Sequence, residues 1–322
     1  MIREADLLPR GNPQLVKLTQ GPMRFKRVIP SPDGKRLFVL GLQPRSQLVR
    51  YDANSGRLDP ILPETSILWP NFSRDGQWIC YVQEKALWRS RVNGSERRQL
   101  TFPPMSTYLP QWSPDGKHIV FEGAELGKPY KIYVVSVEEG KIEQVTTGPL
   151  WDADPHWSPD GNSLIFGRFG SRQDPQDRQA VIINRIDLRT KQISAVPGSE
   201  GLRSPSWSPS GRYISASTDD MSTLKLFDTT TQKWRPLATV TASFPHWSKD
   251  EKYIYVSSGE ADKHPAISRV RIADGRLEWI RSLEDIRSPL GFPWAGLAPD
   301  GSPVTVRDLG TQDIYSLELH KR

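Results

Sequence analysis

The stretch Pro110-Gln111-Trp112-Ser113-Pro114-Asp115-Gly116, followed by the apolar run His118-Ile119-Val120-Phe121, decides the fold of this chain. Its Ser-Pro-Asp-Gly part predicts a tight turn after a strand, because Pro presets φ and Gly accepts positive φ. Copies of the turn recur every 40 to 50 residues, at Asp33, Asp75, Asp115, Asp160, Ser210, Asp250 and Asp300. A period of this length, with several strands per repeat, indicates a β-propeller.

Seven turns predict an all-β, seven-bladed propeller of four-stranded antiparallel blades. The two chain ends complement each other: residues 14–22 resemble residues 141–149, which close the third repeat as its fourth strand. Three further strands are expected at 294–297, 304–307 and 314–319. The N-terminal strand should therefore complete the C-terminal blade, which closes the ring and removes two exposed sheet edges.

Composition limits the remaining possibilities. Because single repeats cannot bury their apolar faces, we expect a lead-in at 1–12 and a single propeller domain over 13–322. The net charge of +6 is spread over 43 basic and 37 acidic residues without a block of five or more like charges, so no nucleic-acid partner is expected. Cys80, the single cysteine, excludes an intrachain disulfide. We find no secretory signal and no apolar run that could span a membrane, and we expect a monomer.

The Asp and the aromatic residue that recur from repeat to repeat both have a structural explanation. The Asp side chain of the turn should accept backbone N–H groups rather than bind a metal ion, because it recurs once per repeat beside a strand. The aromatic residue that precedes the turn should fill space between neighbouring blades. These aromatic residues are Phe72, Trp112, Trp157, Trp207 and Trp247.

A candidate site lies where the innermost strands begin, because loop length varies on that rim while the turns on the other rim are stereotyped. The residue between Pro and the aromatic should face the opening, and it is polar in five copies: Asn71, Gln111, His156, Ser206 and His246. A second set lies just upstream or close by: Arg27, Trp69, Tyr108, Asp154, Arg203, Phe244 and Trp294. Aromatic, polar and charged groups around one mouth fit a pocket for a small molecule, a peptide or a protein segment. A solvated channel would also need polar groups at these positions.

Two histidines keep a metal site open as an alternative. His156 and His246, with Asp154, carry ligand types that suit several divalent ions. They lie two repeats apart without a short-range ligand spacing, so we expect no metal and no cofactor. The sequence contains no Gly-x-Ser-x-Gly nucleophile motif.

The repeat Pro-x-Trp-Ser-Pro-Asp-Gly-x-x-Ile-x-Phe resembles the WD40-like propeller repeat of the TolB type, from about residue 13 onward and most closely at 110–121 and 155–166. The resemblance implies a bacterial source and a binding or scaffolding role. Relatives of this kind occur outside the membrane segment of larger regulatory proteins, which implies a periplasmic or extracytoplasmic place. Oligogalacturonate lyases are further relatives, with histidines and a bound metal in the propeller channel.

The sequence thus predicts a non-catalytic sensor or interaction module that binds a ligand at the channel mouth. Trp69, Tyr108, Phe244 and Trp294 would supply apolar surface, and Arg27, Asp154 and Arg203 would supply charge. The alternative is a metal-dependent lyase or hydrolase that uses the same channel. A scaffold with an empty channel and partner contacts on a blade side is the third reading.

Overall fold

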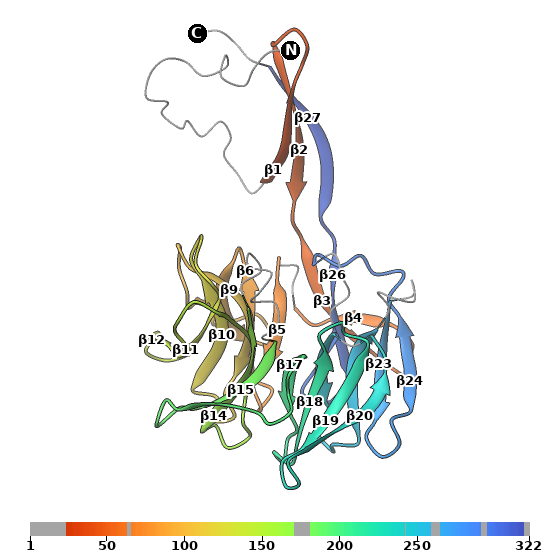
Figure 1. Ribbon diagram of the computed structural model, residues 1–322. Helices are drawn as coiled ribbons and strands as arrows, with labels where there is room; N and C mark the ends of the chain where they lie inside the picture. The colour runs from red at the N-terminus through yellow and green to blue at the C-terminus, as the bar shows by residue number, and fades with distance from the viewer. Residues whose placement is uncertain are drawn as a thin grey trace. The chain divides into compact units, whose positions relative to one another are not determined.

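The computed structural model describes residues 24–62, 66–170, 181–241, 243–258, 265–290 and 295–318, and within them every regular element is a β-strand. The strands form seven antiparallel sheets, the number expected from the seven turns, and the all-β propeller architecture is confirmed (Figure 1). No helix long and apolar enough to cross a membrane occurs among these residues. We expected one domain, and the chain separates into two compact units: 45–309, and 1–44 together with 310–322.

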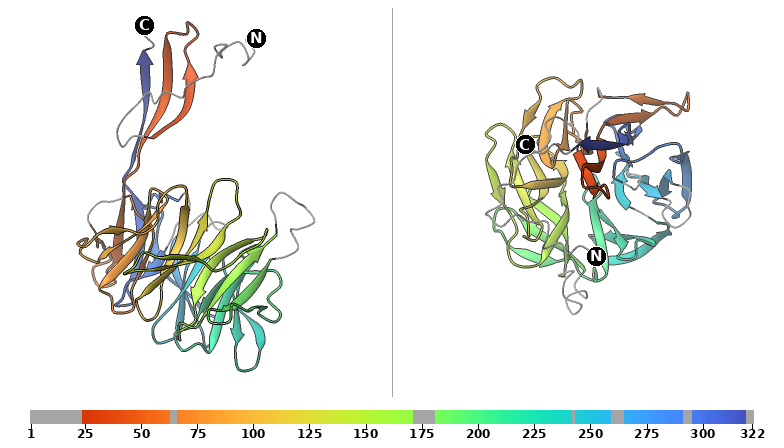
Figure 2. Two further views of the ribbon diagram at one scale, coloured as in Figure 1. Left: turned by 90° about the vertical axis from the view of Figure 1, so that its left-hand side faces the viewer. Right: turned by 90° about the horizontal axis from the view of Figure 1, so that it is seen from above.

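The larger unit contains six sheets of four strands, arranged as blades around a common centre (Figure 2). Five blades are each built from consecutive strands, hydrogen-bonded in chain order. The first two are β5 (Leu68–Phe72), β6 (Trp78–Gln83), β7 (Ala86–Arg91) and β8 (Arg98–Gln99), then β9 (Ser106–Trp112), β10 (His118–Ala124), β11 (Lys131–Ser136) and β12 (Ile142–Gln144). The next two are β13 (Trp151–Trp157), β14 (Ser163–Phe169), β15 (Ile182–Asp187) and β16 (Ile193–Ala195), then β17 (Leu202–Trp207), β18 (Tyr213–Thr218), β19 (Thr223–Asp228) and β20 (Lys233–Thr239). The fifth is β21 (Ser243–Trp247), β22 (Tyr253–Ser258), β23 (Ala266–Arg271) and β24 (Leu277–Ser282).

The sixth blade closes the ring with strands from both ends of the chain. Its order is β25 (Ala295–Leu297), β26 (Pro303–Asp308), β3 (Ser46–Tyr51) and β4 (Leu58–Pro60). Leu48 of β3 and Val304 of β26 are buried in one cluster with Ile79 of the neighbouring blade, so apolar packing continues across the closure. The prediction that strands from the two ends of the chain close the ring is therefore confirmed. The N-terminal strands that do so are β3 and β4 of the first repeat, not a strand at 14–22.

The seventh sheet corrects the expected uniformity of the blades, because it has three strands and lies in the smaller unit. Its order is β1 (Arg24–Pro30), β2 (Arg36–Gln43) and β27 (Thr311–Glu318). The expected third strand of the C-terminal blade thus pairs with β2 instead, from the Arg36–Glu318 pair to the Gln43–Thr311 pair. The strand expected at 14–22 and the lead-in at 1–12 lie outside the described residues.

The turn and wedge predictions are confirmed. In the β9–β10 turn, Ser113 Oγ donates to the Asp115 carboxylate at 2.6 Å, and that carboxylate accepts the Lys117 N–H at 3.0 Å. Trp157 is 6% exposed and packs with Val120 of the preceding blade, and its Nε1–H donates to the backbone carbonyl of Gln111 at 3.2 Å. The rings therefore fill the space between blades, and those of Trp157 and Trp247 also donate a hydrogen bond to the preceding blade.

Candidate functional site

A bulge in the innermost strands shapes the central channel. Five of these strands carry a residue with positive φ directly before the proline: Trp69, Leu109, Asp154, Ser204 and Phe244, with φ from 44° to 53°. The pairing register shifts at the same place, between Ala153 and His156 in β13 for example. Such bulges re-aim side chains. Here they let the bulge residue and the residue after the proline both line one opening.

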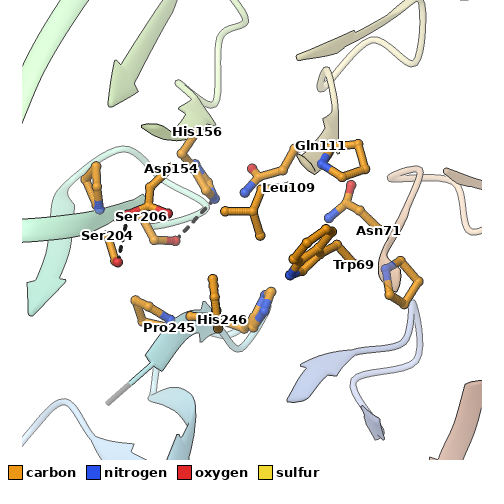
Figure 3. A pocket seen from close by; sticks show the side chains of 14 residues that line it. Trp69, Asn71, Leu109, Gln111, Asp154, His156, Ser204, Ser206, Pro245 and His246 are labelled. Carbon is orange, nitrogen blue, oxygen red and sulfur yellow. Dashed lines mark hydrogen bonds between the residues drawn. The ribbon is translucent and has the colours of Figure 1, made fainter. Parts of the chain in front are cut away.

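The channel gathers residues from five blades around a narrow centre (Figure 3). The space that the centres of water molecules can occupy is about 80 Å³, which is room for a few waters rather than for a drug-sized ligand. Eight of the twelve predicted site residues line it: Asn71, Gln111, His156, Ser206, His246, Trp69, Asp154 and Phe244.

Three of the other four predicted residues lie elsewhere, and the fourth is not among the described residues. Tyr108 contacts the channel wall indirectly, through the ring of Trp69 at 5.3 Å between centroids. Arg203 pairs with Asp219 at 3.6 Å and lies over the ring of Phe169. Arg27 belongs to β1 in the smaller unit, and Trp294 is outside the described residues. Arg27 has a positive φ of 50°, like the bulge residues of the five blades that line the channel, so it was assigned to the right position in the repeat. Its strand β1 nevertheless belongs to the three-stranded sheet and not to a blade around the channel.

The polar channel residues mostly contact protein groups. Asn71 Oδ1 accepts the Trp112 N–H of the next blade at 2.9 Å. His156 Nε2 lies 3.2 Å from Ser206 Oγ, and its Nδ1 lies 3.0 Å from the Trp157 carbonyl and 3.3 Å from the Trp207 nitrogen. These side chains therefore link neighbouring blades, a structural role that also requires polar residues here.

The two histidines are uncharged at neutral pH. Burial lowers the pKa of His156 to about 4, and burial together with the charge of His156 lowers the pKa of His246 to about 4. A neutral imidazole can bind a metal, but both ring nitrogens of His156 already lie near partners. Among the described residues, no three His, Cys, Asp or Glu side chains converge in a way that could hold a metal ion. The described residues thus offer His156 and His246 no third ligand for the metal of the alternative reading.

Glu122, which was not foreseen, forms an acidic pair with the channel residue Asp154. Glu122 of β10 is 7% exposed, and its Oε1 accepts the backbone N–H of Asp154 at 2.6 Å. Asp154 Oδ2 in turn accepts the hydroxyl of Ser204 at 2.9 Å. Burial and the neighbouring Asp154 carboxylate raise the pKa of Glu122 to about 8, and burial raises the pKa of Asp154. Because Glu122 belongs to a second strand, the innermost-strand pattern gave no signal for it.

A series of aromatic rings extends from the channel across three blades. Trp69, Tyr108, Tyr130 and Trp151 contact one another edge to face, with successive centroids 5.3, 5.2 and 5.1 Å apart. All four side chains are partly exposed. We call these four residues the aromatic arc. Tyr130 lies in the loop before β11, so only its position in the fold, and not the repeat motif, brings it into the series.

A second, larger cavity lies between two blades near the Ser-Pro-Asp-Gly turns. The space open to the centres of water molecules there is about 550 Å³. Val134, Val145 and Trp157 supply apolar walls, and the Lys191–Glu143 ion pair, 2.6 Å long, crosses between the blades. Stereotyped turns had directed the sequence prediction away from this rim.

Comparison with known proteins agrees with this architecture. A family model described as the TolB beta propeller domain matches residues 41–176 and 85–251, well over half of the chain. The chain belongs to the TolB beta propeller family. No curated protein matches it in sequence.

Solved structures similar to this family member include two TolB proteins and a lyase. A putative TolB from Agrobacterium tumefaciens is 21% identical with a TM-score of 0.64, over 83% of this chain and 99% of that one. TolB from Acinetobacter baumannii is 20% identical with a TM-score of 0.60, over 75% and 64%. An oligogalacturonate lyase from Vibrio parahaemolyticus is 12% identical with a TM-score of 0.58, over 90% and 92%. At these identities the likeness is one of fold alone.

Proposed function

We propose that this TolB-like propeller is a non-catalytic binding module that takes a peptide or protein segment at the channel mouth, as the interaction part of a larger bacterial regulatory or envelope protein. The aromatic arc is the observation that carries this proposal. Four partly exposed rings in contact form a continuous apolar surface beside the opening. The few residues that carry most of the binding energy in protein recognition are enriched in Trp and Tyr.

The size of the channel favours a ligand that rests on the rim. A space of about 80 Å³ admits a side chain or a few waters, whereas the arc offers the larger contact area. Trp69 belongs to both, since it lines the channel and contacts Tyr108. A peptide that inserts one side chain into the channel and lays its neighbours on the arc satisfies both features.

A peptide-display selection against the purified protein tests the arc. Peptides enriched on the wild type should bind the Tyr108→Ala/Tyr130→Ala variant roughly tenfold to a hundredfold more weakly, because two central anchors are truncated. Trp279→Ala is the matched control, since Trp279 on β24 is 65% exposed and lies outside the arc. Selected peptides that bind the double variant as tightly as the wild type would reject the proposal.

The enzyme alternative has a separate measurement. Elemental analysis of the purified wild type, His156→Ala and His246→Ala would reveal a stoichiometric transition metal. A metal lost in both variants, together with cleavage of oligogalacturonate by the wild type, would replace the binding module with the lyase. We expect neither result, because the ring nitrogens of His156 already contact protein groups.

A further inference from the structure

The outer strands of two blades carry arginines and an aromatic ring at matching register positions. At one position the first blade has Glu278 and the second has Arg98. In the blade of β21–β24, Arg269 lies opposite Glu278, and Arg271 lies opposite Tyr253. In the blade of β5–β8, Arg89 takes the register position of Arg269, and it lies opposite Arg98. The last positions also correspond, because Arg91 lies opposite Trp78.

The blade of β21–β24 shows what this arrangement binds. Nε and Nη2 of Arg269 each lie 2.8 Å from Oε2 of Glu278, a two-point contact with one carboxylate. Arg271 Nη2 approaches the other oxygen at 3.6 Å, and the Arg269 guanidinium lies 4.0 Å from the ring centroid of Tyr253. Two arginines, one of them over an aromatic ring, thus hold one oxyanion, a geometry that suits carboxylate and phosphate alike.

The blade of β5–β8 has the same cationic and aromatic groups, but no carboxylate at the register position of Glu278. The guanidinium groups of Arg89 and Arg91 lie 4.3 and 4.1 Å from the ring centroid of Trp78. Arg98 replaces the glutamate, so two like charges face each other across adjacent strands, which is destabilising.

Arg89 has no counterpart of Glu278 opposite it, and nearby Glu96 pairs with Arg91 instead. The Nε of Arg89 is buried and has no hydrogen-bond acceptor among the described residues. Burial and repulsion from Arg98 and Arg91 lower its pKa, while nearby Glu96 acts in the opposite direction. The neighbours are already engaged: Arg91 pairs with Glu96 at 2.9 Å, and Arg98 Nη1 donates to the Glu138 carbonyl at 2.8 Å.

We propose that Arg89 and Arg98, with Arg91 beside them, form a binding site on the outer strands β7 and β8 for an oxyanion, the carboxylate or phosphate group of a ligand supplied from outside. The bound anion would occupy the place that Glu278 fills in the blade of β21–β24. This site is separate from the aromatic arc and does not depend on it.

The direction in which the melting temperature of the anion-free protein changes on substitution tests the site. Arg98→Glu supplies the missing carboxylate, so it should raise the melting temperature in anion-poor buffer and remove the response to added anion. Arg269→Gln is the matched control: it breaks the equivalent ion pair, so it should lower the melting temperature and leave the anion response intact. A lowered melting temperature for folded Arg98→Glu would overturn the proposal.

Titration calorimetry with inorganic phosphate and with succinate, at ionic strength matched with potassium chloride, distinguishes the source of the anion. Saturable binding of either to the wild type, at least tenfold weaker in Arg89→Gln, supports the site, and the tighter of the two identifies the group. Circular dichroism establishes that Arg89→Gln is folded. Binding that is equal in wild type and Arg89→Gln, or no binding of either anion, rejects it.

Discussion

Glu122 makes the free energy of unfolding depend on pH. Its pKa is raised to about 8, from an ordinary value of 4.5, by burial and by Asp154. The folded protein therefore holds this proton more tightly than the unfolded chain does. Its contribution to stability is complete below pH 4.5 and is lost as the pH rises through 8. The histidines act in the opposite sense, because their lowered pKa values cost stability as the pH falls from 6.5 toward 4.

Glu122→Gln should flatten this pH dependence. Gln keeps an oxygen that can accept the Asp154 N–H, but it has no proton to lose. Between pH 6.5 and 8, where the histidines contribute little, the variant should gain stability relative to the wild type by up to about 1.4 kcal/mol per pH unit. Urea unfolding across this range measures the difference. Glu125→Gln, which alters an exposed carboxylate paired with Lys128, is the control. Parallel pH profiles for Glu122→Gln and the wild type would contradict the assignment.

The elements show which local features a sequence pattern reveals. The turns were predictable, because Ser, Pro, Asp and Gly each have a specific conformational or hydrogen-bonding role there. The bulges were not, because the residues with positive φ are Trp69, Leu109, Asp154, Ser204 and Phe244, which share no side-chain property. The conformation goes with the shift in pairing register between the first two strands of a sheet, and Arg27 has it without a following proline. The bulge decides which side chains line the channel.

The β13–β14 turn allows the contribution of one such turn to the free energy of unfolding to be measured. Ser158 Oγ accepts the N–H of Ser163 at 2.9 Å and donates to Asp160 at 2.5 Å, in a buried setting. Ser158→Ala leaves that N–H buried without an acceptor, so it should cost about 1–3 kcal/mol in the free energy of unfolding. Ser248→Ala removes the same bonds from the more exposed β21–β22 turn and should cost less, since water can replace them. Equal losses at both turns would mean that burial does not govern the cost.

At the scale of the whole molecule, the repeat count was right and the assignment of the end strands was not. The two-residue connection between β6 and β7 is Glu84-Lys85, with φ of 51° and 66°, as a tight hairpin requires. The corresponding connection between β2 and β3 is Pro44-Arg45, and Pro cannot adopt positive φ. β3 therefore does not fold back on β2 and pairs with β26 instead. A count of turns gives no information on this choice, which depends on one residue in a connection.

Fragments of the chain test whether 45–309 folds by itself or only as part of the single domain expected over 13–322. Residues 45–309 include all six four-stranded sheets, so this fragment should be monomeric and should unfold cooperatively. Residues 62–309 lack β3 and β4, which leaves β26 with an open edge and exposes the apolar cluster around Val304, so this fragment should aggregate or fail to fold. Size-exclusion chromatography and calorimetry compare the two. If 45–309 aggregates while the full chain is stable, the strands β1, β2 and β27 are needed to complete the propeller, and the chain is one domain after all.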